Sequence, residues 1–372
     1  MSSHSIENIP RYFVPYTSDC FQNAYGAVIS YMNLNPDLIL ADYLSFMFEA
    51  DTGYIGVNFL HKSSKAFNFT EEELNTSLEY AHFPAVSCFT GPGEASAEVL
   101  SDKIKICMYF EDNPDIAHDR LEELINNDMP VVAVVDLYYM RYHRAYQREH
   151  GAHAVIVTGY NEEEGYVELF DKYSLSNSDF DGKIPINEFR LARSSENFLG
   201  SFSKPIRHLW MEISKSPSFY YNNLRWKNII EESCKRMLGE KSVLGIKCGL
   251  SVIDSFREEL LNKKQELSGD ELFSVYRHYY NSAFKILSRS RQRFGVFLRQ
   301  LDSRLLSDIV EDAVFHLEDS SRRWEIISNM SLRLAITKNL SSIDNLCNQL
   351  EEIGNSEALA TEKLLQCVKS WY

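Results

Sequence analysis

Apolar residues follow two different spacings in the first part of the chain. Two segments, 20–34 and 117–127, place apolar residues at helical intervals. Short runs rich in β-branched residues predict strands. These runs are 131–137, 153–160, 166–171 and 208–213. Because consecutive strands joined by turns pair most readily in opposite directions, we expect an antiparallel sheet with helices packed beside it, which is an α+β fold.

The pattern changes near Ser216. The β-branched runs end there, proline is absent after Pro217, and apolar residues recur at three- and four-residue steps. One such series is Leu287, Phe294, Phe297, Leu298, Leu301 and Leu305. We therefore expect a bundle of four to six helices. The chain is predicted to contain an α+β domain at 1–215 and an all-α helical-bundle domain at 216–372.

Composition narrows the classes of function. The 372 residues carry a net charge of −15, and hydrophobic residues make up 44% of them, which favours a folded chain with a sizeable core. Proteins that bind nucleic acids generally present a basic face, so no nucleic-acid partner is expected. The acidity is local: residues 1–215 hold 16 basic and 32 acidic side chains, whereas 216–372 hold 22 and 21.

Cysteine content and segment hydropathy bear on the cellular compartment. The seven cysteines form an odd set without a close metal-ligand spacing, which favours free thiols in a reducing compartment. The first residues lack the basic and apolar regions of a secretory signal. No stretch approaches the roughly 18 apolar residues of a membrane span. We expect a cytoplasmic protein with no membrane partner, and the sequence does not indicate its oligomeric state.

Cys20 is the first candidate for chemistry. It follows Ser18 and Asp19, which are both good N-cap residues, and it begins a segment of helical periodicity. The unpaired N–H groups and dipole at a helix start favour a thiolate and can stabilise an oxyanion. The competing interpretation is a buried structural thiol, because free cysteine is among the most buried residue types.

His153 and Asp171 are the second and third candidates. His153 begins one predicted strand and Asp171 ends the next, so a hairpin would place both at the same end. An acid in that position can accept the imidazole N–H and fix its tautomer. The order Cys20, His153, Asp171 resembles that of papain-like enzymes. Each residue also has a structural interpretation: a hydrogen-bonded histidine at a sheet edge, or an acid that starts a turn.

Other chemistries have weaker support. A metal site could combine Cys20 with His143, His150 and His153, but this histidine spacing matches no structural zinc pattern, so no metal is expected. The sequence contains no G-x-S-x-G elbow, P-loop or G-x-G-x-x-G motif, which leaves serine hydrolases and nucleotide-binding enzymes without support.

Several blocks resemble the butirosin biosynthesis protein H family. Residues 19–59 look like its beginning, 131–160 and 166–193 like its histidine- and aspartate-bearing blocks, and 289–298 and 320–330 like its helical region. The resemblance covers most of the chain. It implies a papain-like, C39-peptidase-like N-terminal domain of a cysteine acyltransferase, with Cys20, His153 and Asp171 as its catalytic triad.

The resemblance leads to a specific functional hypothesis. We expect an acyl or aminoacyl group to move from a carrier-protein thioester to a small amine in secondary-metabolite biosynthesis, through an acyl-Cys20 intermediate. No cofactor is expected besides the phosphopantetheine that carries the substrate. The alternatives are a cysteine hydrolase with the same triad (a peptidase, amidase or thioesterase using water as acceptor) and a non-catalytic binding module.

The sequence departs from C39-like peptidases at the oxyanion hole. Those enzymes place a glutamine shortly before the cysteine, whereas here Gln22 follows it. The candidates for the missing donor are Tyr16, Thr17 and Gln22. This departure favours thioester cleavage over amide hydrolysis, because a thiol is the better leaving group.

Two further segments are candidate contact surfaces. The loop 138–152 is aromatic and basic, and it could close over substrate or remain a solvated loop; Asp136 and Tyr142 are its candidate substrate residues. The segment 285–304 is basic and could attract an acidic carrier protein, or it could form internal ion pairs. Its candidate docking residues are Arg289, Arg291, Arg293 and Arg299.

Overall fold

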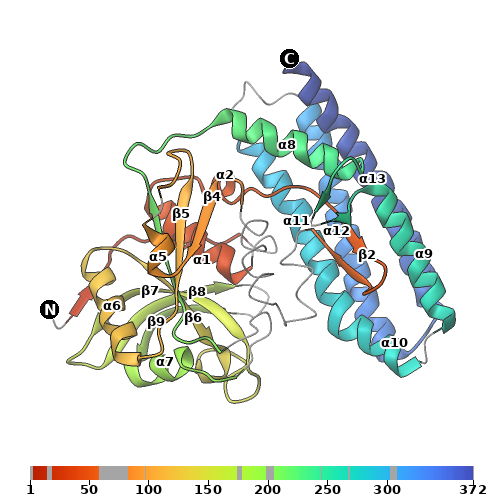
Figure 1. Ribbon diagram of the computed structural model, residues 1–372. Helices are drawn as coiled ribbons and strands as arrows, with labels where there is room; N and C mark the ends of the chain where they lie inside the picture. The colour runs from red at the N-terminus through yellow and green to blue at the C-terminus, as the bar shows by residue number, and fades with distance from the viewer. Residues whose placement is uncertain are drawn as a thin grey trace. The chain divides into compact units, whose positions relative to one another are not determined.

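The chain folds into two compact units. The computed structural model describes residues 3–14, 19–57, 83–96, 98–173, 178–197, 205–243, 245–266, 269–301 and 308–371 (Figure 1). The first unit contains the described residues of Met1–Leu40 and His82–Tyr221. The second contains those of Ala41–Ala66 and Asn222–Tyr372. No helix in these described ranges is both long and apolar enough to cross a membrane.

A mixed β-sheet forms the centre of the first unit. Its strands follow the order β4-β5-β10-β6-β7-β8-β9, and β1 pairs with β7. Their bounds are β1 Ser3–Ser5, β4 Val86–Thr90, β5 Ile104–Tyr109, β6 Val131–Asp136, β7 Ala152–Asn161, β8 Tyr166–Tyr173, β9 Ser178–Pro185 and β10 Trp210–Lys215. Every residue of β6 is buried, as expected for an apolar strand covered on both faces.

The prediction of an antiparallel sheet is wrong for one strand pair. The run β6, β7, β8, β9 is antiparallel throughout, but β4 and β5 are parallel. Parallel neighbours require a crossover connection, which here includes the short helix α5 (Gly91–Ala95). Short turns carry no signal for such a pairing, and β4, β5 and β9 were not recognised in the sequence.

Four further helices are seen among the described residues of the first unit. They are α1 (Cys20–Tyr31), α2 (Pro36–Ile39), α6 (Pro114–Asn126) and α7 (Ile186–Arg193). α1 packs against β7 and β8, and α6 packs against β7 and β1. The predicted helices at 20–34 and 117–127 are confirmed in position, with α1 beginning at Cys20.

The second unit confirms the predicted helical region. Its helices are α8 (Asn223–Met237), α9 (Leu250–Glu266), α10 (Gly269–Val275), α11 (Asn281–Arg299), α12 (Asp308–Thr337) and α13 (Ser342–Ser370), with a π-helical turn at Tyr276–Tyr280. The long helices α11, α12 and α13 pack along one another (Figure 1). Phe46, Phe256, Phe284 and Trp324 lie in its apolar core.

Two small hairpins also lie in the described part of this second unit. One pairs β2 (Met47–Glu49) with β3 (Tyr54–Gly56), and the other pairs β11 (Ser242–Val243) with β12 (Ile246–Lys247). β2 contacts α9, and β3 contacts α11. A segment that precedes most of the first unit in sequence therefore packs with the helices.

Candidate active site

Cys20 occupies the first position of α1, and local hydrogen bonds define that helix start. Asp19 Oδ1 accepts a 2.8 Å hydrogen bond from the backbone N–H of Gln22. The Gln22 Oε1 atom accepts one of 3.1 Å from the backbone N–H of Asp19. This reciprocal capping box satisfies two N–H groups and fixes the entry of the chain into the helix. The Gln22 side chain, a candidate for oxyanion stabilisation, is thus engaged in capping.

His153 and Asp171 lie on neighbouring strands and contact each other directly. His153 Nε2 donates a 2.8 Å hydrogen bond to Asp171 Oδ1. Both side chains are buried, with 2% and 3% of their surface exposed. His153 is the second residue of β7, and Asp171 is near the end of β8. The hairpin therefore brings the two groups to the same end, as the strand pattern predicted.

The pKa of His153 depends on Cys20 as well as on Asp171. Burial alone would lower the pKa of His153, because it disfavours the charged imidazolium. Charge interactions with Cys20 and Asp171, together with side-chain hydrogen bonds to both, outweigh burial and raise the pKa to about 10. The imidazole is thus held between a sulfur and a carboxylate, which is the arrangement required to activate a thiol.

Tyr142 supports Asp171 from the loop 138–152. Its hydroxyl donates a 3.0 Å hydrogen bond to Asp171 Oδ2, the oxygen not used by His153. Its ring stacks on Phe180 of β9, with centroids 4.2 Å apart and planes inclined by 9°. Burial and the charge of Asp171 raise the pKa of Tyr142 well above its usual value, so the hydroxyl remains a donor. The sequence suggested a substrate contact here, whereas the structure shows a residue that positions Asp171.

Asp136 organises the base of the same loop. It is fully buried, and its carboxylate accepts hydrogen bonds from the Ser195 hydroxyl, His150 Nδ1 and the backbone N–H groups of Tyr138 and Gly151. Four donors satisfy both oxygens, which accounts for a buried carboxylate without a paired guanidinium or ammonium. In this structure Asp136 holds the ends of the loop together.

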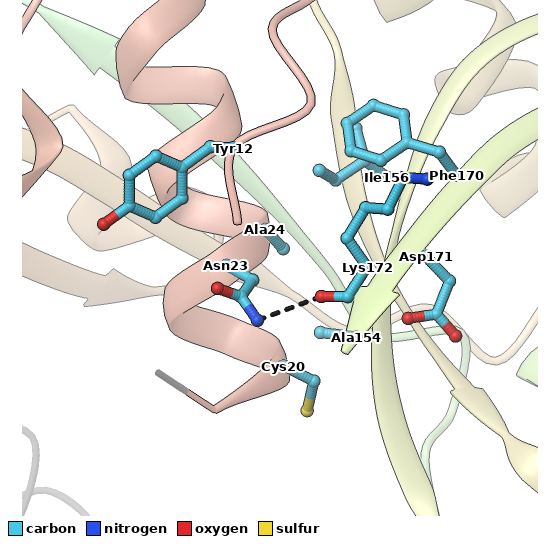
Figure 2. A pocket seen from close by; sticks show the side chains of 9 residues that line it. All are labelled: Tyr12, Cys20, Asn23, Ala24, Ala154, Ile156, Phe170, Asp171 and Lys172. Atoms are coloured by element: carbon cyan, nitrogen blue, oxygen red, sulfur yellow. Dashed lines mark hydrogen bonds between the residues drawn. The ribbon is translucent and has the colours of Figure 1, made fainter. Parts of the chain in front are cut away.

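A small pocket lies between α1 and the β7–β8 hairpin (Figure 2). Figure 2 shows Cys20 at the end of the helix and Asp171 on the neighbouring strand. The pocket is lined by Tyr12, Cys20, Asn23, Ala24, Ala154, Ile156, Phe170, Asp171 and Lys172. The lining mixes apolar residues with the polar or charged Asn23, Asp171 and Lys172.

Asn23 is a pocket residue that sequence reasoning missed. Its Nδ2 atom donates a 2.9 Å hydrogen bond to the backbone carbonyl of Lys172, which ties α1 to β8. Its Oδ1 atom is buried and has no hydrogen-bond partner within the described part of the chain. Asn23 lies one turn after Cys20, so the signal available in the sequence was a polar residue at i+3 on an otherwise apolar face.

Residues 51–172 match the family model described as butirosin biosynthesis protein H, N-terminal. This confirms the resemblance over that segment, and the family description names a biosynthesis protein. The matched range includes His153 and Asp171, while Cys20 precedes it. No curated protein sequence matches the chain.

Four candidates from the sequence remain: Tyr16, Thr17, His143 and His150. Tyr16 and Thr17 fall outside the described residues. His143 is buried, with its ring centroid 6.0 Å from that of His153, and its Nδ1 accepts a hydrogen bond from the backbone N–H of Ala145. His150 binds Asp136, so the alternative metal set of Cys20 with three histidines is not assembled in the described structure.

The docking hypothesis needs a correction at Arg291. Its side chain is completely buried and forms a bidentate ion pair with Glu357, which also accepts hydrogen bonds from Ser320 and Trp324. Arg291 cannot face a partner, because it neutralises a carboxylate in the core. Arg299 is exposed and pairs with acidic residues of α12. Arg289 and Arg293 also have interactions within the protein.

Proposed function

We propose that the protein is a cysteine acyltransferase that moves an acyl or aminoacyl group from a carrier-protein thioester to a small amine. The observation that carries the proposal is the Cys20–His153–Asp171 arrangement, with the cysteine at a helix start and a hydrogen-bonded histidine–carboxylate pair beside it. The biosynthetic family match is compatible with this chemistry. A papain-like architecture of the first unit is part of the same proposal.

The first half of the reaction forms an acyl-enzyme. The Cys20 thiolate attacks the thioester carbonyl, and N–H groups at the start of α1 stabilise the oxyanion. The carbon–sulfur bond to phosphopantetheine then breaks. The departing thiolate takes a proton from the His153 imidazolium, which leaves acyl-Cys20 and a neutral imidazole.

The second half transfers the acyl group to the amine. Neutral His153 accepts a proton from the amine as its nitrogen attacks the acyl-Cys20 carbonyl. The bond to sulfur breaks and restores the thiolate beside the imidazolium. Asp171 orients the imidazole and stabilises its charge in both halves, and Tyr142 orients Asp171.

Intact-mass spectrometry tests the nucleophile. The protein is mixed with a carrier protein loaded with an acyl thioester, and a covalent adduct of the acyl mass is expected. Cys20→Ala should abolish the adduct. Cys88→Ala is the matched control, because Cys88 is another incompletely buried free thiol of the first unit. An adduct of equal yield in Cys20→Ala would overturn the assignment.

Product analysis separates transfer from hydrolysis. With a primary amine present, the acyl group is expected to appear as an amide; free acid formed at the same rate with and without amine would instead identify a thioesterase. The carrier protein remains part of the proposal, and the internal ion pairs of Arg299 limit how much charge the helical unit can offer it.

A further inference from the structure

A second cluster of ionisable side chains lies in the first unit. His118 and Glu122 project from one face of α6, because they are four residues apart. Glu162 directly follows β7, at the opposite end of that strand from His153. One ligand atom from each of these three side chains lies within 4.8 Å of the other two.

We propose that His118, Glu122 and Glu162 bind a divalent transition-metal ion such as Zn²⁺. His118 Nε2 lies 2.8 Å from a Glu162 oxygen and 3.3 Å from a Glu122 oxygen. Zinc–nitrogen and zinc–oxygen bonds of about 2.0–2.2 Å place neighbouring ligand atoms roughly 3–3.5 Å apart. The three side chains therefore need only small shifts to surround an ion.

The three side chains differ in how deeply they are buried, which leaves one side of the cluster open to an entering ion. His118 is 2% exposed, Glu122 is partly buried and Glu162 is exposed. Burial disfavours a charged imidazole, and neutral imidazole is the form that binds metals. The exposed side leaves room for water as the remaining ligand, as in sites with three protein ligands.

The surrounding charges set limits on the affinity. Arg190 and Arg193 act electrostatically on His118, and their positive charges oppose a cation. Glu162 supplies compensating negative charge, and Glu122 adds to it only after losing a proton, because burial and Glu162 raise the pKa of Glu122 to about 7. His118 Nδ1 is buried without a hydrogen-bond partner in the described ranges, so it lacks the orienting contact that most metal-binding histidines have. We expect weaker binding than at a site whose histidine ligand has such a contact.

The mixed donor set determines the choice of ion. Imidazole nitrogen favours Zn²⁺ and similar transition ions, whereas Mg²⁺ and Ca²⁺ prefer oxygen ligands throughout. A bound ion would join α6 to the end of β7. Its expected effect is to stabilise the first unit without contact with Cys20.

Isothermal titration calorimetry with Zn²⁺ alone tests this site. The full chain carrying Cys20→Ala is used beside the wild type, so that the thiol cannot compete for the ion. One saturable site is expected in both proteins, with no comparable binding of Mg²⁺. Glu162→Gln should weaken it at least about tenfold, since even loss of a supporting outer contact costs 10–100-fold. Glu163→Gln, an exposed neighbour outside the cluster, is the control.

A spectroscopic measurement guards against binding elsewhere. Co²⁺ substituted at the site should show visible absorption without a thiolate-to-metal charge-transfer band, because all three ligands are nitrogen or oxygen. Absence of a saturable Zn²⁺ site would overturn the proposal, as would equal affinity in Glu162→Gln and Glu163→Gln. Far-ultraviolet circular dichroism establishes that both variants are folded.

Discussion

The hydroxyl of Tyr142 donates to one oxygen of Asp171, 3.0 Å away, while His153 binds the other oxygen. The carboxylate is therefore fixed at both ends. Since Asp171 orients His153, a loop tyrosine that does not line the pocket controls the geometry of the imidazole beside Cys20. This relationship gives the loop 138–152 a specific function in the fold.

Tyr142→Phe should slow acylation of Cys20 without abolishing it. The ring can keep its stacking on Phe180, but a buried carboxylate oxygen loses its donor. An unsatisfied buried acceptor costs about 1–3 kcal/mol, or more when charged. We expect a comparable loss of unfolding free energy in urea and a lower single-turnover acylation rate at unchanged carrier affinity.

Tyr146→Phe is the control for this substitution. Tyr146 belongs to the same loop, and its hydroxyl contacts the neighbouring Gln147 instead of Asp171. Loss of the Tyr146 hydroxyl should leave both the free energy of unfolding and the acylation rate close to those of the wild type. Equal rates in wild type and Tyr142→Phe would show that the tyrosine does not position the aspartate.

His153 should remain protonated well above the range in which ordinary histidines titrate. The pKa of about 10 results from Cys20 and Asp171 acting against burial. Nuclear magnetic resonance of the ring protons should report this value directly. Cys20→Ala removes one of the two groups that raise the pKa of His153, so this pKa should fall in that variant, and an unchanged value would contradict the contact.

The same raised pKa has a defined effect on stability. The pKa of His153 in the folded protein exceeds its unfolded value of about 6.5. Protonated His153 therefore makes its full contribution to the free energy of unfolding below about pH 6.5. It is lost as the pH rises through about 10. Urea unfolding across this window should therefore show a decline in wild type that is smaller in Asp171→Asn, where one of the favourable charges is absent.

Local signals made part of the site predictable from sequence. Ser18 and Asp19 are good N-cap residues ahead of a segment with helical periodicity, which placed Cys20 correctly at the first position of α1. Runs rich in β-branched residues, joined by a short turn, likewise predicted the hairpin that joins His153 to Asp171. Both features depend on neighbours in sequence, for which spacing rules are informative.

The features that were missed depend on distant residues. The parallel pairing of β4 with β5 needs a crossover connection, which turn residues do not predict. Arg291 looked like a surface charge because its partner Glu357 lies 66 positions away on another helix. Spacing along one element cannot reveal which side chains from another element meet it.

Asn23 should matter for both stability and acylation. Asn23→Leu has a similar volume, but it leaves the Lys172 carbonyl without its side-chain donor. We expect the unfolding free energy to fall by about 1–3 kcal/mol and the acylation rate to fall, because α1 positions Cys20 against β8. Hydrogen exchange at the start of α1 measures this loosening. Asn127→Leu is the comparison, since Asn127 binds a carbonyl of α6 on an exposed surface.

Arg291→Met should strongly destabilise the helical unit. It leaves Glu357 buried without its counter-charge, and removing one member of a buried ion pair costs about 3–5 kcal/mol. Burial works against the Glu357 carboxylate, but Arg291, Trp324 and Ser320 together hold its pKa below the usual value. The stabilisation is therefore present above pH about 4.3 and is lost as the pH falls through the lowered folded value.

Replacing both members of the pair separates structure from docking. Arg291→Met combined with Glu357→Leu removes both buried charges and should recover much of the stability lost in Arg291→Met alone, as measured by urea unfolding. Arg299→Met should cost about 0–1 kcal/mol, because its ion pairs are exposed. If a carrier protein binds this unit through charge, its affinity should fall with salt and respond to Arg299→Met, while the stable double variant binds like wild type. A specific loss of carrier binding in that double variant would restore Arg291 as a docking residue.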